Sequence, residues 1–163
     1  MNLVSQTLHD EHRATIALME RLEQLIARHQ RGLPDVGNRA IGQLLAELAT
    51  AVEADVEHHF RFEEDRLFTF LEAAGDAAIG AHLADEHSAM RPLGKRVAAL
   101  AREAAVRGFD AATWEEFRRT GQELCERMLM HVQKEEMALL PLLEESMDSE
   151  TDARLHQEYL ETA

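Results

Sequence analysis

Residues 59–64 read His-Phe-Arg-Phe-Glu-Glu, and residues 131–136 read His-Val-Gln-Lys-Glu-Glu. Each segment places a histidine four residues before a glutamate: His59 before Glu63, and His131 before Glu135. On an α-helix, side chains at positions i and i+4 lie one turn apart on the same face. The repeated motif therefore predicts two separate helices, each of which carries an imidazole and a carboxylate on one stripe. That is an arrangement of metal ligands.

The apolar residues around both motifs recur every three or four positions, which is the period of an amphipathic helix. Glycine and proline separate these periodic segments, most clearly at residues 32–37, at Gly75 and at Gly108. The pattern predicts four long helices and a short last one: residues 5–30, 39–73, 76–107, 110 or 113 to 147, and 149–161. We therefore expect an all-α fold, an antiparallel up-down-up-down four-helix bundle with a short C-terminal helix.

Single residues predict several local features of these helices. Ser5 is expected to cap the first helix, and residues 113–116 are expected to form a capping box. Pro92 removes one backbone hydrogen bond and is expected to kink or divide the third helix. The inward stripes of the second and fourth helices are predicted to end at Phe70 and Leu142.

The composition bounds the class of protein. The 163 residues suit one domain over residues 1–163, with the bundle at 5–147 and an extension at 148–163. A formal charge of −14 disfavours nucleic acid and anionic membranes as partners. Cys125 is the only cysteine, which excludes a disulfide framework and thiolate-rich zinc sites and fits a reducing cytoplasm. The sequence predicts neither a signal peptide nor a membrane span.

Glu63 and Glu135 are predicted to face the apolar interior, where unpaired carboxylates are costly and a bound cation would remove that cost. Two further histidines lie on apolar stripes of the other helices, His12 on the first and His87 on the third. Both lie early in their helices, whereas the histidines of the repeated motif lie late in theirs. In an antiparallel bundle these positions meet, so we expect all six side chains to converge at one level.

The predicted ligand set holds four imidazoles and two carboxylates: His12, His59, Glu63, His87, His131 and Glu135. Six donors exceed the four of a tetrahedral zinc site, but they suit two first-row metal ions bridged by the two carboxylates. Imidazole and carboxylate with open positions are typical of iron, although zinc or another divalent ion is compatible with the same donors.

The ordered set of motifs resembles the hemerythrin-like, HHE cation-binding family over roughly residues 5–145. Four segments are similar to the family's helix motifs: Leu-His-Asp-Glu-His at 8–12, His-Phe with Glu-Glu and Leu-Phe at 59–68, Glu-His at 86–87, and His with Glu-Glu and Leu-Pro at 131–141. The resemblance implies a non-haem di-iron centre, with two iron ions that bind O₂ or related molecules such as NO or peroxide. It also implies terminal imidazole ligands and bridging carboxylates from Glu63 and Glu135.

The sequence departs from the oxygen-carrying members of that family at one position. Those proteins place an extra histidine on the third helix, four residues before its other one, and Leu83 stands there in this sequence. His82 points about 140° away from the direction of His87 and is a poor substitute. With one nitrogen ligand fewer, oxidation or sensing becomes a stronger expectation than reversible O₂ carriage.

Several polar residues near the motifs are expected to stay outside the ligand set. Glu64 and Glu136 are rotated by about 140° from their histidines and should face solvent or a neighbouring helix. Arg66 is expected to extend toward the end of the bundle. His9 could approach the site, and Tyr159 is a candidate lid over it.

Three functions stay open from the sequence alone. The first is a di-iron protein that binds or reduces O₂, peroxide or NO, which as an enzyme would be an oxidoreductase. The second is a cytoplasmic iron or redox sensor, or an iron-handling protein, in which metal binding is coupled to folding without turnover. The third is a purely structural bundle. The expected partner is a small diatomic or peroxide ligand, and a homodimer is possible.

Overall fold

The computed structural model describes residues 1–162, and within that part of the chain all regular secondary structure is helical. The first long helix is α1 (Leu3–Arg28), and the third is α5 (Ala77–Arg107). The second long helix is built from five consecutive segments: α2 (Arg39–Thr50), η1 (Ala51–Val56), α3 (Glu57–Phe62), η2 (Glu63–Leu67) and α4 (Phe68–Ala73). The fourth long helix and the C-terminal helix are made of α6 (Ala111–Lys134), η3 (Glu135–Leu139), α7 (Leu140–Ser146) and α8 (Ser149–Thr162).

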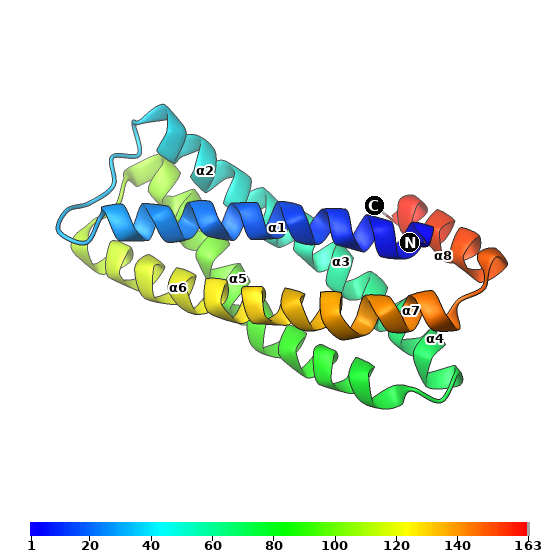
Figure 1. The fold of residues 1–163 in the computed structure, drawn as a ribbon. Coiled ribbons are helices and arrows are strands. Elements are labelled where there is room, and N and C mark those ends of the chain that lie inside the picture. The colour runs from blue at the N-terminus through cyan, green and yellow to red at the C-terminus, as the bar shows by residue number, and fades with distance from the viewer. Residues whose placement is uncertain (163) are drawn as a thin grey trace.

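The four long helices form the predicted bundle (Figure 1). Helices that follow one another in sequence are neighbours in space, since α1 packs against α2, α2 against α5 and α5 against α6, and the contact of α1 with α6 closes the bundle. The short α8 lies across one end of the bundle, beside the start of α1 (Figure 1). The structure thus confirms the all-α fold and the short C-terminal helix.

Turns of π-helix interrupt the second and fourth long helices, and the sequence analysis did not foresee them. The segments η1, η2 and η3 each have i→i+5 hydrogen bonding, which accommodates one extra residue in a turn. The inward stripe therefore moves by one position beyond η2 and η3. Leu71 and Leu143 are fully buried in place of Phe70 and Leu142, which are only partly buried. The predicted ends of both stripes were wrong for this reason.

Helix ends also differ from the sequence predictions. Asn2 rather than Ser5 caps α1, and its side chain accepts a hydrogen bond from the backbone N–H of Ser5 at 2.8 Å. The capping box at α6 joins Asp110 to Thr113, so the predicted box over residues 113–116 was wrong. Pro92 does not divide the third helix, which continues through it as α5.

The core consists of two apolar clusters with a polar layer between them. On α1, His12 lies between Leu8 of one cluster and Met19 of the other, and on α5 His87 lies between Leu83 and Met90. Within the described chain only eight polar or charged side chains are buried: Ser5, His12, His59, Glu63, His87, His131, Glu135 and Asp152. Six of these eight are the predicted ligands, so the polar layer is the candidate metal site.

The C-terminal helix is fastened to the start of α1 by a buried carboxylate. Asp152 accepts hydrogen bonds from the backbone N–H groups of Leu3 at 2.8 Å and Val4 at 2.9 Å. These N–H groups have no partner within their own helix, and the positive end of the helix dipole favours a carboxylate there. The contact therefore stabilises α1 and α8 together.

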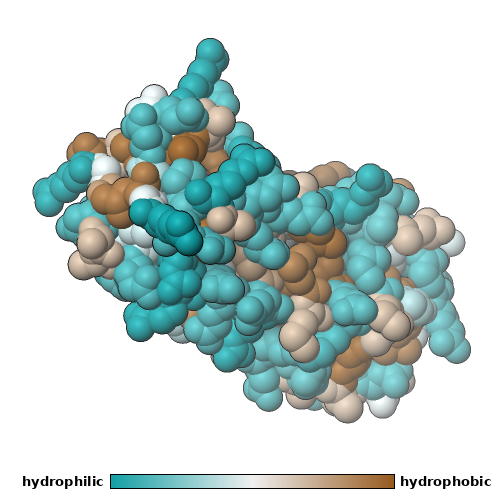
Figure 2. Space-filling view, turned by 60° about the vertical axis from the view of Figure 1, so that its left-hand side comes forward, coloured by the Kyte–Doolittle hydropathy of each residue, from teal (hydrophilic) through white to brown (hydrophobic). Residues whose placement is uncertain are grey.

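The surface in Figure 2 is mostly hydrophilic, with hydrophobic side chains in separate small areas. Among residues 1–162 there is no helix whose length and hydropathy would allow it to cross a bilayer.

We expect Asp152→Ala to lower the free energy of unfolding by about 1–2 kcal/mol, because it removes both acceptors from the start of α1. For a chain of this size that corresponds to a Tm about 2–8 °C lower in a thermal melt. Asp65→Ala, which removes an exposed carboxylate from the second long helix, is the matched control and should leave the Tm within about 1 °C. A melt of Asp152→Ala that coincides with the control would contradict this assignment.

Cys125 offers an independent probe of the packed bundle. Its side chain is buried, its Sγ–H donates to the backbone carbonyl of Met19 at 3.5 Å, and burial raises the pKa of the thiol to about 12. Because the thiolate is the reactive form, an aromatic disulfide reagent at pH 8 should label the native chain slowly and the denatured chain fast. Rapid, complete labelling of the native protein would show that this packing is incorrect.

Candidate metal centre

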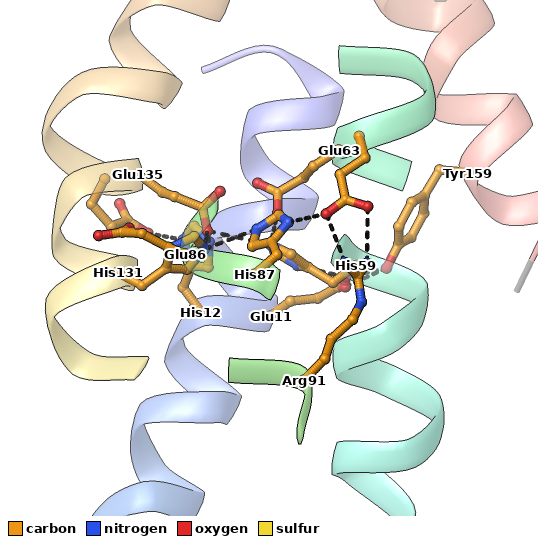
Figure 3. Close-up of polar contacts among 12 residues, drawn as sticks. Glu11, His12, His59, Glu63, Glu86, His87, Arg91, His131, Glu135 and Tyr159 are labelled. Atoms are coloured by element: carbon orange, nitrogen blue, oxygen red, sulfur yellow. Dashed lines mark hydrogen bonds and ion pairs between the residues drawn. The ribbon is translucent and has the colours of Figure 1, made fainter. Parts of the chain in front are cut away.

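The six predicted ligands meet at one level of the bundle, and each long helix supplies at least one of them (Figure 3). Their exposed fractions are all 6% or less: His12, His59, Glu63, His87, His131 and Glu135. The helical spacing explains this directly, since each histidine and glutamate of the repeated motif lies one turn apart on an inward stripe.

These side chains form two adjacent clusters that share Glu135. One cluster holds Glu63, His87, His131 and Glu135, and the other holds His12, His59 and Glu135, with the donor atoms of each cluster within 4.8 Å of one another. The imidazole Nε2 atoms face the carboxylates, at these distances to the nearest Oε1: 2.8 Å for His131 and 3.5 Å for His12, both to Glu135, and 3.2 Å for His59 and 3.3 Å for His87, both to Glu63.

The hydrogen bonding of these donors fits a bound cation. Both carboxylate oxygens of Glu63, one oxygen of Glu135 and Nε2 of His12 are buried without a hydrogen-bond partner in the described chain. The Nε2 atoms of His87 and His131 lie only 3.1 Å apart, so donor atoms converge on the same space. Buried carboxylates left in this state are costly. Positive ions between them would satisfy all of these atoms at once, so the residues suit metal binding.

The two glutamates proposed to bridge the metal ions each stand at the first position of a π-helical turn. Glu63 begins η2, and Glu135 begins η3. Such turns occur frequently at functional sites, because the wider turn changes the direction of the side chains that follow. Periodicity at 3.6 residues per turn could not predict them. The matching position of both turns makes the second and fourth long helices equivalent at the site.

A second layer of carboxylates orients the imidazoles from behind. The Nδ1 atom of each histidine lies near a glutamate on the adjacent helix: His12 with Glu136 at 2.7 Å, His59 with Glu11 at 3.5 Å, His87 with Glu64 at 2.6 Å and His131 with Glu86 at 2.8 Å. A carboxylate beside Nδ1 accepts a hydrogen bond from Nδ1–H and so favours the tautomer with the proton on Nδ1. The lone pair of Nε2 is then available to a metal ion.

The sequence analysis missed this role of the outer glutamates. Glu64 and Glu136 do turn to a neighbouring helix, as predicted. Each carboxylate contacts the Nδ1 atom of a candidate ligand there, Glu64 that of His87 and Glu136 that of His12. Glu11 and Glu86 directly precede His12 and His87 in the sequence, and these two Glu-His pairs are the pattern that could have revealed them. Their partners lie on other helices, so only the tertiary structure connects them.

Burial and the carboxylates set the pKa values within the site. Burial alone would lower the pKa of His59, but Glu63 and Glu11 outweigh it and raise that pKa to about 10. Burial dominates at His131, whose pKa falls to about 4, and at His12, whose pKa is also lowered. Glu63 keeps a lowered pKa despite its burial, because the cationic His59 lies beside it. A metal ion on His59 would replace this proton.

Aromatic side chains cover one side of the site. The ring of Phe60 stacks on His87 with centroids 3.8 Å apart, and Phe68 lies on the same imidazole at 5.9 Å. Phe60 is buried in the core and also contacts this candidate ligand. The cluster that contains His87 is therefore enclosed by apolar groups.

The remaining candidates lie at the edge of the site. Tyr159 of α8 donates its hydroxyl to Glu11, the carboxylate behind His59, and so reaches the site through one intervening residue (Figure 3). Arg66 does not approach the bridging carboxylates but pairs with Glu158 of α8 at 3.3 Å.

Two further histidines that the sequence left open do not join the clusters. His9 bonds to Glu136 at 3.0 Å, so it too is one residue removed from the ligands. The side chain of His82 is 60% exposed. Neither residue belongs to the two donor clusters of the described chain.

We expect Glu136→Gln to weaken metal binding about 10–100-fold, because His12 loses the charged partner that holds its tautomer and strengthens it as a ligand. Competition between the protein and a chromogenic chelator for cobalt or zinc measures the change. Glu145→Gln, an exposed position on the same long helix, is the control and should bind as the unmodified chain does. Equal affinities for the two variants would argue against an orienting role of Glu136.

Comparison with known proteins gives one family. A model of the hemerythrin HHE cation binding domain matches residues 3–143, and a second match covers residues 85–162. No curated protein and no solved structure is matched. The first match spans all six candidate ligands and most of the chain, and it agrees with the buried donors described above. The chain therefore belongs to the hemerythrin HHE cation-binding family.

Proposed function

We propose that this protein binds two iron ions and uses them to bind or react with O₂, peroxide or NO. The observation that carries the proposal is the pair of donor clusters sharing Glu135, in which four buried atoms, on Glu63, Glu135 and His12, have no hydrogen-bond partner within residues 1–162. Six donors in two clusters support two ions, because a single tetrahedral ion needs only four. Membership of the cation-binding family supports the same assignment.

Imidazole and carboxylate donors suit iron, which when bound supplies electrons to a small oxidising ligand. The side chains of the protein give a small ligand access to the donors and keep solvent away from part of the site. A cavity touches His12, His59 and Glu135, so a small ligand has a path to the cluster with three donors. Phe60, which also lines this cavity, and Phe68 cover the imidazole of His87, which is fully buried.

Leu83 supports reaction or sensing over reversible O₂ carriage. This residue is fully packed in the apolar cluster one turn from His87, where oxygen carriers of the resembled type have another imidazole. The described part of the third helix thus offers one nitrogen donor to the clusters. Fewer nitrogen ligands leave more open coordination positions for a reacting molecule.

A sensor without turnover is the second candidate, and the unpartnered oxygens of Glu63 favour it. Removal of the cation would leave buried carboxylates uncompensated, a cost of several kcal/mol that couples metal binding to folding. The single cysteine supports a cytoplasmic setting for either candidate.

Metal analysis together with optical spectroscopy tests the proposal. Anaerobically loaded protein should contain two iron ions per chain, and its near-UV and visible ligand-to-metal bands should change when O₂ or peroxide is added. His59→Ala should hold at most one ion, whereas His82→Ala, which changes an exposed imidazole, should keep two.

The outcomes separate the candidates. One metal ion per unmodified chain would rule out the di-iron centre. Turnover of peroxide supports an oxidoreductase. A large loss of helical circular dichroism on chelation, without turnover, supports the sensor.

A further inference from the structure

A cavity of about 270 Å³ lies between α1, the middle of the second long helix (η1 and α3) and α6, next to the cluster of three donors. It reaches four of the candidate ligands at its inner end, His12, His59, His131 and Glu135, and the exposed residues Ala14 and Asp55 mark its outer end. O₂, NO or peroxide needs roughly the space of one or two water molecules, each of which occupies about 30 Å³. The cavity is therefore several times larger than the proposed small ligands require.

The wall of the cavity is mostly apolar. Its apolar lining comes from three of the long helices: Leu18 and Met19, then Val52, Val56 and Phe60, and finally Met128 and Val132. Volumes near 300 Å³ with apolar walls and a few polar groups are typical of sites for small organic molecules. Water gains little from such a wall, so displacement of water by an apolar ligand is favourable.

The helix that forms part of this wall changes from α-helical to π-helical hydrogen bonding there. Four residues of the π-helical segment η1 line the cavity: Ala51, Val52, Asp55 and Val56. The other two π-helical turns, η2 and η3, each begin at a candidate ligand, but η1 contains none. Since π-turns are rare and frequently mark functional sites, η1 is accounted for by the cavity and not by metal binding.

The outer end of the cavity favours a cation, because the exposed carboxylate of Asp55 lies there and the described lining residues include no lysine or arginine. The other ionisable side chains of the lining are two carboxylates and four imidazoles: Glu11, Glu135, His12, His58, His59 and His131. Helix α8 adds Tyr159 to the lining, and the ring of Tyr159 contacts that of His58 with centroids 4.4 Å apart, while its hydroxyl donates to Glu11. A ligand with an apolar body inside and an amine at the outer end would match both parts.

We propose that this cavity is a binding site for a small aliphatic amine, whose apolar chain lies against the walls and whose ammonium group lies at Asp55. The inference rests on the proposed function, because it places the amine beside the cluster of His12 and His59. It adds an organic ligand to a centre otherwise assigned only diatomic molecules or peroxide.

Titration of zinc-loaded protein with two six-carbon probes, followed by NMR chemical shifts, tests the proposal without any redox chemistry. Hexylamine is a cation at pH 7, whereas hexanol is neutral. We expect hexylamine to bind with saturation and hexanol to bind about two- to fivefold more weakly, as expected for a ligand without the ion pair to Asp55.

Two variants with matched controls locate the site. Asp55→Asn should weaken hexylamine about two- to fivefold and leave hexanol unchanged, as expected for loss of one exposed ion pair. Glu53→Gln removes another exposed carboxylate of η1 that pairs with Arg102 outside the cavity, and it should change neither probe. Thr15→Phe places a ring in the cavity and should abolish binding of both probes, whereas the exposed Ala17→Phe should not.

The proposal is overturned if hexylamine shows no saturable binding, if hexanol binds as tightly, or if Asp55→Asn equals Glu53→Gln. Iron stoichiometry of the same preparations separates this result from the fate of the di-iron centre. Two iron ions without amine binding would refute the cavity ligand alone. Amine binding with fewer than two ions would refute the di-iron centre alone.

Discussion

The burial of two carboxylates, Glu63 and Glu135, inside an apolar helical bundle is the constraint on which the rest of the structure depends. Both are almost completely removed from solvent, and three of their four oxygens have no hydrogen-bond partner in the described chain. An apolar core tolerates such groups only when positive charge compensates them. The imidazoles around them and the cations that the family binds supply that compensation, and the two apolar clusters seal the layer on either side.

A ring of contacts ties the four helices to this layer. Each helix offers one outer glutamate to the histidine of the next, in this order: Glu11 to His59, Glu64 to His87, Glu86 to His131 and Glu136 to His12. The ring passes once around the bundle and returns to the first helix. A change of level in any one helix would disturb two of these contacts, so the ring sets helix order and depth together with the imidazole tautomers.

The C-terminal helix links the stability of the fold to the site. Asp152 joins α8 to the start of α1, and Tyr159 of the same helix holds the carboxylate behind His59. The sequence could rank Tyr159 only as an open candidate, because its distance along the chain from Glu11 carries no information about contact. The cavity walled by η1 was equally invisible, since a π-helical turn leaves no periodic pattern of its own.

The sequence by itself determined the bundle and the composition of the polar layer that forms the candidate metal site. Helical periodicity and the i, i+4 spacing place His59 with Glu63 on one inward face, and antiparallel packing brings His12 to the same level. The tertiary structure alone decided which side chains stand behind the ligands and where a π-turn shifts an inward stripe, as from Phe70 to Leu71. The physical reason is that spacing along one helix determines the direction of a side chain, whereas its partner is set by the neighbouring helix against which it packs.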